Sequence, residues 1–572
     1  DTSEGEGGTF EGEAGTFEGD PSPRRSVLPW LAILLLALSL RLPLALAGFP
    51  YINYVDEGHV LHPVVALLQS GSWDPKWHLY PSLPFYAIAG AVWVWSPIYS
   101  ALHGQPLREG LSPFPPRIYD LVAPAEVLAA GRLVTLGFSL GVVLLTGLLA
   151  RRVTGSQAAG LFAALAAALV PALVIRGGIA TVDPFTTFFT VAAVYFAEGA
   201  VRGSRPWRDS ILAGLTIGCA LTSKYTGVLV CLPVAVTLLR MQGGWRYKAR
   251  AVELAALASL IAAAVTMPAL VLKNEQVLDS LARHAMGYQF VTMGSYWEQA
   301  VKRAEWDHPF EHPELGLPFL ILAALGWVVA MWDCRTRGTA AAWTLYAAVV
   351  LALFTSFSAQ PFRNLLPLVP VACVLVAIFF AWLRELRWRP LVDAAAAVLL
   401  LALFLPAEIG YARERARLVD SRVEAVEWLA RHRRPDETLL IAMELPILPS
   451  EAAKLPGKVL VMPQRQAIPR LIRRRDVQMV VTGIFRWKEP DLRKALNEGR
   501  TRARYRQVAT FGEKPGTGIW RGNRQRVLIY RRVARNEATA SEANPRIRPS
   551  RKPGGANSRS MRPTPSRAIT PR

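Results

Sequence analysis

Cysteine is scarce in this chain, with four residues among 572. Cys219, Cys231 and Cys373 lie in apolar runs, and Cys334 lies beside a basic loop. None of them is placed for a disulfide in an oxidising compartment, and no Cys/His spacing resembles a zinc site. We therefore expect neither a disulfide scaffold nor cysteine-based catalysis.

Glycine-rich nucleotide motifs are also missing. No P-loop, no dinucleotide fingerprint and no Gly-x-Ser-x-Gly elbow stands out. The segments predicted to face the cytoplasm are too short to form a nucleotide-binding domain. A reaction with a nucleotide donor on the cytoplasmic side is thus unsupported.

Acidic residues are few in the last third of the chain. Residues 409–572 hold 37 Lys/Arg against 15 Asp/Glu, which accounts for the whole net charge of +22. This balance predicts anionic partners such as phospholipid headgroups, pyrophosphate carriers or acidic glycans. Attachment to a membrane domain argues against nucleic acid as a partner.

Apolar residues are abundant. A hydrophobic content of 52% and a mean hydropathy of +0.24 predict a polytopic membrane protein. Basic clusters recur between the apolar runs and mark cytoplasmic turns, which gives about 11 transmembrane helices with a cytoplasmic N-terminus. The expected spans are 27–47, 127–149, 157–176, 184–201, 210–223, 226–239, 251–271, 315–332, 340–358, 362–383 and 391–407.

One further apolar run, 83–102, would give an odd number of crossings between two cytoplasmic turns, which is not possible. It carries Trp93, Trp95 and Pro97. An aromatic run broken by proline is typical of a helix that lies at the membrane interface. We therefore expect this run to be a juxtamembrane helix in the first outer loop.

The sequence divides into four regions by composition. The acidic, Gly-rich residues 1–23 and the basic residues 535–572 are predicted to be disordered. Residues 24–408 form the membrane domain, and 409–534 form a small extracytoplasmic α/β domain. In that domain we expect helices at 421–429 and 490–497 and strands at 438–442, 459–462, 477–482 and 527–530.

A pair of carboxylates, Asp56 and Glu57, follows the first membrane-length run. Burial in lipid does not explain charges at this place, where an enzyme acting on a lipid-carried substrate would need a base. The alternative is a solvated acidic loop. Neighbours on a helix point about 100° apart, so the two carboxylates need not share a role.

The pair is followed by Gly71-Ser72-Trp73-Asp74 and then by Tyr80-Pro81-Ser82-Leu83. This order resembles the first outer loop of the polyprenyl-phosphate-sugar-dependent glycosyltransferases of the C-type fold. That superfamily includes the protein O-mannosyltransferases and the lipid A aminoarabinose transferase. The resemblance implies a GT-C-like membrane domain in which Asp56 is the general base and Glu57 positions the acceptor or a divalent ion. It also implies a polyprenyl-phosphate sugar as the donor.

Three basic residues match cations of the same superfamily. Arg132 heads the second crossing, Lys224 lies in Thr222-Ser223-Lys224-Tyr225, and Arg363 precedes Asn364-Leu365-Leu366-Pro367. The resemblance implies that all three bind the donor phosphate. Snorkelling of Arg132 to headgroups and anchoring of a turn by Lys224 are the structural alternatives.

Five further residues are candidates for substrate contacts. Asp183 could contact the acceptor or a metal, although Asp before Pro184 also suits a helix N-cap. His59 could hydrogen-bond to Asp56 or ligate a metal, or lie solvated at the interface. Tyr80, Tyr225 and Asn364 are expected to line the substrate site; many relatives have Tyr in place of Asn364.

The sequence therefore predicts an integral membrane glycosyltransferase that acts on the outer face of the membrane with inversion at the sugar. Its partners are the lipid-linked donor, an acceptor protein, lipid or glycan, and the bilayer. A divalent cation (Mg, Mn or Ca) is an open requirement. A transporter or flippase for lipid-linked glycans and a non-catalytic scaffold are the competing hypotheses; charges grouped at outer helix ends favour the enzyme.

Overall fold

The computed structural model describes residues 23–533 apart from gaps at 53, 112–122, 291–314, 356–361, 387–388, 417–418, 442–446, 448, 462–476, 485–504 and 513–525. The two expected disordered ends, apart from Pro23, and the expected helix at 490–497 lie outside the described residues.

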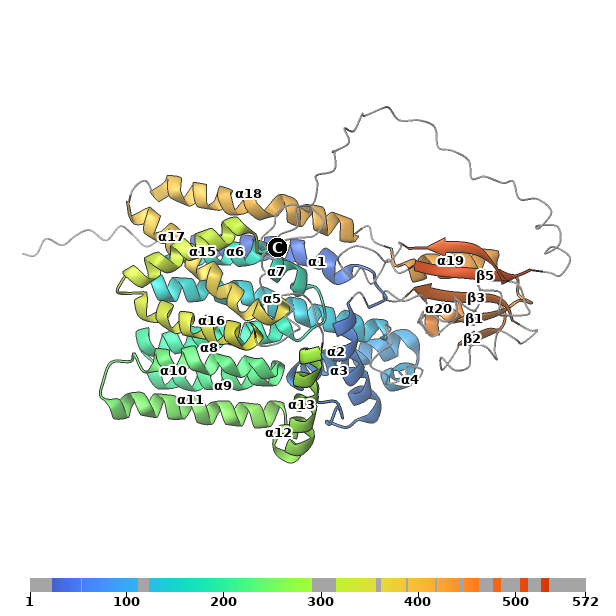
Figure 1. Ribbon diagram of the computed structural model, residues 1–572, viewed down its shortest axis with the longest axis horizontal. Coiled ribbons are helices and arrows are strands. Elements are labelled where there is room, and N and C mark those ends of the chain that lie inside the picture. Colours follow the sequence, from blue (N-terminus) through green and yellow to red (C-terminus); the bar gives the residue numbers. More distant parts are fainter. Residues whose placement is uncertain are drawn as a thin grey trace, which may run out of the picture.

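The membrane domain is entirely helical in its described part (Figure 1). Its 3-10 helices are η1 (Tyr225–Val230) and η2 (Phe362–Leu368). Its α-helices are α1 (Pro23–Leu46), α2 (Val55–Ser70), α3 (Leu83–His103), α4 (Leu107–Leu111), α5 (Ala125–Thr154), α6 (Gln157–Leu169), α7 (Pro171–Gly177), α8 (Asp183–Arg202), α9 (Pro206–Ser223), α10 (Cys231–Leu238), α11 (Trp245–Thr266), α12 (Ala269–Leu272), α13 (Asn274–Phe290), α15 (Leu317–Trp332), α16 (Arg337–Thr355), α17 (Val369–Leu386) and α18 (Arg389–Ala416).

Among the described residues, eight helices are long and apolar enough to cross a membrane, or nine if α6 and α7 count as one bent span. The eight include α3, which the sequence assigned to the interface. Two of the expected spans, 226–239 and 315–332, are shorter apolar helices. The expected span at 210–223 lies in α9, which starts with the charged pair Arg208 and Asp209. Length and apolarity alone therefore give a lower number than the sequence predicted, although the polytopic helical fold is confirmed.

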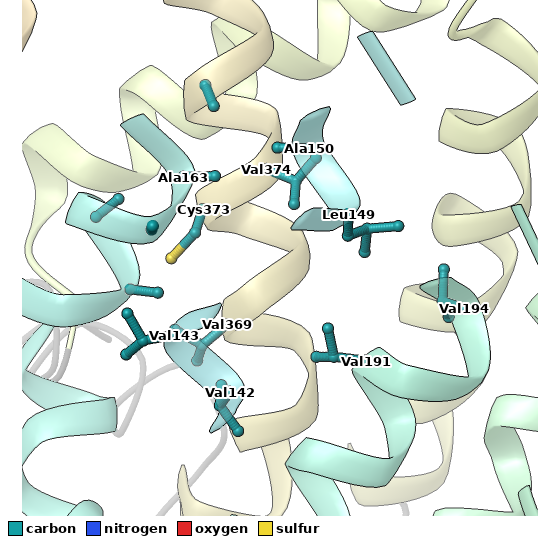
Figure 2. Close-up of a cluster of buried hydrophobic side chains, with 14 of the residues drawn as sticks. Val142, Val143, Leu149, Ala150, Ala163, Val191, Val194, Val369, Cys373 and Val374 are labelled. Atoms are coloured by element: carbon teal, nitrogen blue, oxygen red, sulfur yellow. The ribbon is translucent and has the colours of Figure 1, made fainter. Parts of the chain in front are cut away.

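The centre of the bundle is packed from small and β-branched side chains (Figure 2). Val142 and Val143 of α5, Val191 of α8 and Val374 of α17 meet there around the buried Cys373. Tight contacts between small residues are the usual way for helices to associate in lipid, where apolar burial alone does not drive association.

The chain bends sharply between α6 and α7. Pro171 has no N–H, so the carbonyl of Ala167 loses its usual helical donor, and the two helices meet at 60°. The buried Arg41 of α1 donates to Ala167 O at 3.0 Å and to Ala168 O at 2.8 Å, and its Nε donates to Ser139 Oγ at 3.0 Å. An arginine inside an apolar helix is thus explained, since it supplies the donors that the proline removes.

The C-terminal domain is a small α/β unit, as expected. It contains the helices α19 (Ser421–His432) and α20 (Pro449–Ala453) and the strands β1 (Thr438–Ile441), β2 (Val459–Val461), β3 (Val477–Ile484), β4 (Tyr505–Phe511) and β5 (Arg526–Arg532).

The five strands form one sheet in the order β2-β1-β3-β5-β4. β1 pairs in parallel with β2 and β3, whereas β5 pairs antiparallel with β3 and β4. The four predicted strands are present. The edge strand β4 was missed because its polar, largely exposed sequence lacks the apolar run of a buried strand.

Helices from two distant parts of the chain gather at one end of the bundle. In Figure 1, α2, α3, α4 and α13 lie at the end that faces the C-terminal domain. The start of α8 and the end of α9 reach the same end. Lys224 Nζ donates to Asp183 Oδ1 at 2.7 Å, and the next residue, Tyr225, donates its hydroxyl to His78 O between α2 and α3. The candidate site lies at this end.

Candidate functional site

Asp56 lies in the first turn of α2 and forms an ion pair with Arg363 of η2. A carboxylate is favoured in this position because the first turn of a helix carries partial positive charge. The side chains are 17% and 15% exposed, so the pair is reachable from solvent but largely enclosed. Two residues separated by more than 300 positions are thereby brought together, as the sequence predicted for one site.

Asp183, Lys224 and Asn364 form a second polar group beside the first. Lys224 Nζ donates to Asp183 Oδ1 at 2.7 Å and to Asn364 Oδ1 at 2.8 Å. Asn364 is buried, and its Nδ2 has no hydrogen-bond partner among the described residues. A buried amide N–H without a protein partner is costly, and it offers a donor to a bound ligand.

Asp183 does not cap its helix. Val182 is the N-cap of α8, with no side-chain hydrogen bond, and Asp183 is already the first helical residue. Its carboxylate instead accepts from Lys224. The capping alternative is therefore wrong, and the acid belongs to the polar cluster.

The two groups are one cluster because Arg363 and Asn364 are neighbours on η2. The cluster thus contains two carboxylates, Asp56 and Asp183, and two cations, Arg363 and Lys224. Its residues come from α2, α8, the end of α9 and η2. We call these four residues and Asn364 the site cluster.

Glu57, next to Asp56, belongs to a different environment. It is fully buried and pairs with Arg132 of α5. All five N–H donors of Arg132 are engaged: Nε and Nη2 with Glu57 at 2.8 and 3.0 Å, and the others with the carbonyls of Ala45, Ala47 and Tyr51 at 3.0 to 3.2 Å. In this arrangement Arg132 offers no N–H to a donor phosphate.

Glu57 is equally occupied. Its oxygens accept the Arg132 bonds and also the backbone N–H groups of Tyr54 at 3.3 Å and Ala180 at 3.1 Å. The bond to Tyr54 closes the N-terminus of α2. Glu57 and Arg132 therefore hold the segment before α2, α2 itself and α5 together, and protein groups occupy their hydrogen-bonding atoms.

Two residues near the site cluster were missed from the sequence, Tyr54 and Arg176. The Arg176 guanidinium lies 5.4 Å from the centre of the Tyr54 ring. Burial acts to raise the pKa of Tyr54, but the charges of Arg176 and Arg363 and a hydrogen bond with Arg176 outweigh it and lower that pKa below its usual value. An arginine in an apolar segment just before Gly177-Gly178 was a signal that could have found this residue.

The remaining predicted residues lie in α2, in the segment between α2 and α3, and at the start of η1. His59, one turn after Asp56, has its ring 6.4 Å from the rings of both Trp77 and Tyr80. Tyr80 is mostly buried. Tyr225, next to Lys224, donates its hydroxyl to His78 O at 2.8 Å. Tyr225 therefore links the chain beside Lys224 to the segment between α2 and α3.

A second ion pair joins the same loop to another part of the chain. Asp74 pairs with Lys273, which lies between α12 and α13. Burial acts to raise the pKa of Asp74, but Lys273 and the backbone N–H of Lys76 lower it overall. The ion pair therefore stabilises this segment at neutral pH, and its contribution is lost as the pH falls from the ordinary aspartate pKa through the lowered pKa of Asp74. This contact was not predicted.

The divalent cation that the sequence left open stays a prediction. No group of three or more His, Cys, Asp or Glu side chains in the described ranges could hold a metal ion. Asp56 and Asp183 are each paired with a cation, and His59 stands among aromatic rings. We derive no step through a metal.

Residues 126–272 match the family model described as dolichyl-phosphate-mannose-protein mannosyltransferase. A comparison with curated proteins found no match. Among solved structures, ArnT from Cupriavidus metallidurans in the apo state is similar at 15% identity and a TM-score of 0.56, covering 88% of this chain and 98% of that one. The same protein bound to undecaprenyl phosphate matches at 14% identity and 0.53, covering 89% and 98%.

The apo oligosaccharyltransferase of Archaeoglobus fulgidus is similar at 11% identity and a TM-score of 0.47, covering 86% of this chain and 80% of that one. The family match and the ArnT-like fold confirm the resemblance to the GT-C glycosyltransferase superfamily. The chain is an integral membrane protein with this fold.

Proposed function

We propose that the protein transfers a sugar from a polyprenyl-phosphate donor to an acceptor hydroxyl at the outer face of the membrane. The observation that carries the proposal is the site cluster, in which two carboxylates and two cations meet at one end of the bundle. The family match, which spans Asp183 and Lys224, supports it. So does the shared fold with ArnT, for which a structure with undecaprenyl phosphate exists.

Asp56 is the general base in this proposal. It is partly exposed, it lies in the first turn of α2, and it forms an ion pair with Arg363. Asp56 takes the acceptor proton while the acceptor oxygen bonds to the anomeric carbon. The bond from that carbon to the phosphate oxygen breaks on the opposite side, and the polyprenyl phosphate leaves with its electron pair. One displacement of this kind inverts the anomeric configuration.

The phosphate is held by Arg363 and Lys224, with Arg176 as a third cation that the sequence did not predict. Cations placed where negative charge develops on the leaving group stabilise the transition state. Arg363 exchanges its bond to Asp56 for one to the phosphate, which leaves the carboxylate free to accept the proton. Arg132 is reassigned from phosphate binding to positioning, because Glu57 and three carbonyls occupy it.

Substrate hydroxyls meet Asn364 and Asp183. Asn364 brings a buried amide N–H that has no partner in the described part of the chain, and Asp183 has a second carboxylate oxygen beside the one that accepts from Lys224. Tyr80, Tyr225 and His59 line the approach from the first outer loop. Three cations already hold the phosphate, so this mechanism assigns no task to a divalent ion.

The test uses the purified protein in vesicles that contain a panel of polyprenyl-phosphate hexoses and pentoses, with membrane extract as the acceptor pool. We expect release of free polyprenyl phosphate together with a glycosylated product for at least one sugar. The variant Glu253→Gln, which changes an exposed carboxylate on α11 that pairs with Arg250, should behave as the wild type.

A flippase would instead move the intact lipid-linked sugar across the vesicle without releasing polyprenyl phosphate. A scaffold would do neither. Either result across the whole panel would overturn the proposed enzyme.

A further inference from the structure

The segment between α1 and α2, residues 47–54, carries Tyr54 and leads directly into Asp56. Arg132 of the membrane domain holds this segment from one side by donating to the carbonyls of Ala47 and Tyr51. The side chains of Tyr51 and Ile52 are fully buried. The proposed base, Asp56, therefore follows a short segment whose position depends on the residues that contact it.

The C-terminal domain also contacts this segment, through Arg422. Arg422, in the first turn of α19, places its guanidinium 3.9 Å from the centre of the Tyr51 ring. Its Nη2 lies 3.4 Å from the carbonyl oxygen of Ile52 and donates to it. The side chain is fully buried although it bears a charge. The partners are 370 residues apart in the chain.

Asp420 fixes the orientation of this arginine. Its two oxygens accept from Arg422 Nε at 2.9 Å and Nη2 at 2.8 Å, and Oδ1 also accepts from the Arg422 backbone N–H. A buried guanidinium is tolerated only with a paired charge and satisfied donors. The bidentate carboxylate supplies the charge, and stacking on a tyrosine adds a further favourable contact.

Two neighbouring carbonyls, those of Tyr51 and Ile52, are thus bound by arginines from the two domains. Asp56 follows four residues after Ile52. A displacement of about 1 Å at a reacting group can cost a large factor in rate. The junction between the domains is therefore placed where a small movement would reach the base.

We infer that Arg422 is a positioning residue: the C-terminal domain clamps the 47–54 segment through Arg422 and Tyr51 and so keeps Asp56 in line with the site cluster. The inference rests on the proposed function for its catalytic consequence. The clamp itself is a property of the fold and can be measured without any turnover.

Arg433 provides a matched control in the same domain. It is also buried, but its hydrogen bonds go to the carbonyls of Glu437 and Lys458 inside the domain. Replacing it disturbs the domain without touching the 47–54 segment. Arg433→Gln and Arg422→Gln therefore separate loss of domain stability from loss of the clamp.

The experiment is hydrogen–deuterium exchange of the full-length protein in detergent, read from peptides that cover 47–60, combined with donor turnover. For Arg422→Gln we expect exchange in 47–60 to become at least about 10-fold faster and kcat to fall about 10-fold, with KM for the donor changed less than about twofold. Arg433→Gln should speed exchange around β1 and β2 while exchange in 47–60 and kcat stay near wild type. Arg422→Lys, which keeps the charge and one donor, should recover part of the loss.

Unchanged exchange in 47–60 for Arg422→Gln would overturn the clamp. Faster exchange with unaltered kcat would show that the clamp does not position the base. If the wild type itself transfers no sugar from any donor, the proposed function fails, and the exchange result alone still decides whether the domains are clamped. Should Arg422→Gln fail to fold, Arg422→Lys and Tyr51→Leu carry the same comparison.

Discussion

Asp56 and Glu57 are adjacent carboxylates with the same chemistry, but their surroundings differ. Asp56 is partly exposed and pairs with one arginine at the site, whereas Glu57 is fully buried and pairs with Arg132. Consecutive positions on a helix point in different directions, so Asp56 faces Arg363 and Glu57 faces the packed helices. The same split separates Arg363 from Arg132: one can change partners, and the other cannot do so without leaving a buried charge behind.

This contrast predicts opposite phenotypes. Arg132→Gln and Glu57→Gln should each reduce the free energy of unfolding by about 3–5 kcal/mol, since each leaves its partner charged and buried. Arg363→Gln and Lys224→Gln should keep the fold and lose about 2–4 kcal/mol of transition-state stabilisation. Denaturation in detergent measures the first effect, and kcat/KM for the donor measures the second.

Asp56→Asn is the matched comparison for Glu57→Gln, because it makes the same chemical change one residue earlier. Its free energy of unfolding should be close to that of the wild type. A Glu57→Gln protein of normal stability that has lost turnover would return Glu57 to a catalytic role and contradict this division.

At the scale of elements, the bend between α6 and α7 positions Arg176 and the backbone N–H of Ala180 near the site cluster. Pro171 ends α6, Arg41 takes up the carbonyls that the break exposes, and α7 then carries Arg176 towards Tyr54. Ala180, after the break, donates to Glu57. A bend in one helix thus sets a cation and a backbone donor at the site.

Gly177 permits the close approach on which this bend depends. A Cβ at Gly177 would lie 2.4 Å from Ser139 Oγ and 3.0 Å from Arg41 Cδ. We expect Gly177→Ala to destabilise the protein by about 1–3 kcal/mol through overpacking and to lower turnover by shifting Arg176. Thermal unfolding in detergent and donor turnover measure the two effects.

Gly137 on α5 is the control, because a Cβ there meets nothing within 4 Å. Gly137→Ala should be neutral or slightly stabilising. Equal losses for both variants would show that the loss is a general effect of alanine in these helices and would remove the special role of the break.

The elements could be predicted from the sequence to a large extent, because apolar periodicity and turn residues are local signals. The membrane helices and four of the five strands follow from them. The pairings could not be predicted, since Glu57 finds Arg132 75 residues away and nothing local distinguishes that pair from Asp56 and Arg363. A motif shared with a family indicates which residues gather at a site, but only packing decides which arginine is saturated.

For the whole molecule, charge and shape suggest one orientation. The site end carries α2, α3, α13 and the C-terminal domain (Figure 1). Elsewhere, the buried Glu198 near the end of α8 binds Arg202 and Arg240. Positive charge near the helix ends opposite the site is what the positive-inside rule requires of a cytoplasmic surface. We therefore propose that the site end is extracytoplasmic.

Cysteine labelling tests the orientation. In a background without native cysteines, Ser72→Cys and Asp436→Cys should react with a membrane-impermeant thiol reagent in intact cells. Gly155→Cys and Gly244→Cys, in turns where a side chain meets nothing within 4 Å, should react only after permeabilisation. Labelling of Gly155→Cys from outside would invert the topology and place the site in the cytoplasm.

The proposed mechanism depends most directly on Asp56 as the general base. The decisive measurement is mass spectrometry of glycans and glycolipids from cells that lack the protein and are given back either the wild type or Asp56→Asn at matched membrane levels. The account predicts that a glycan restored by the wild type falls by at least about 10²-fold with Asp56→Asn, because the amide cannot accept the acceptor proton. Full restoration of that glycan by Asp56→Asn would contradict the mechanism.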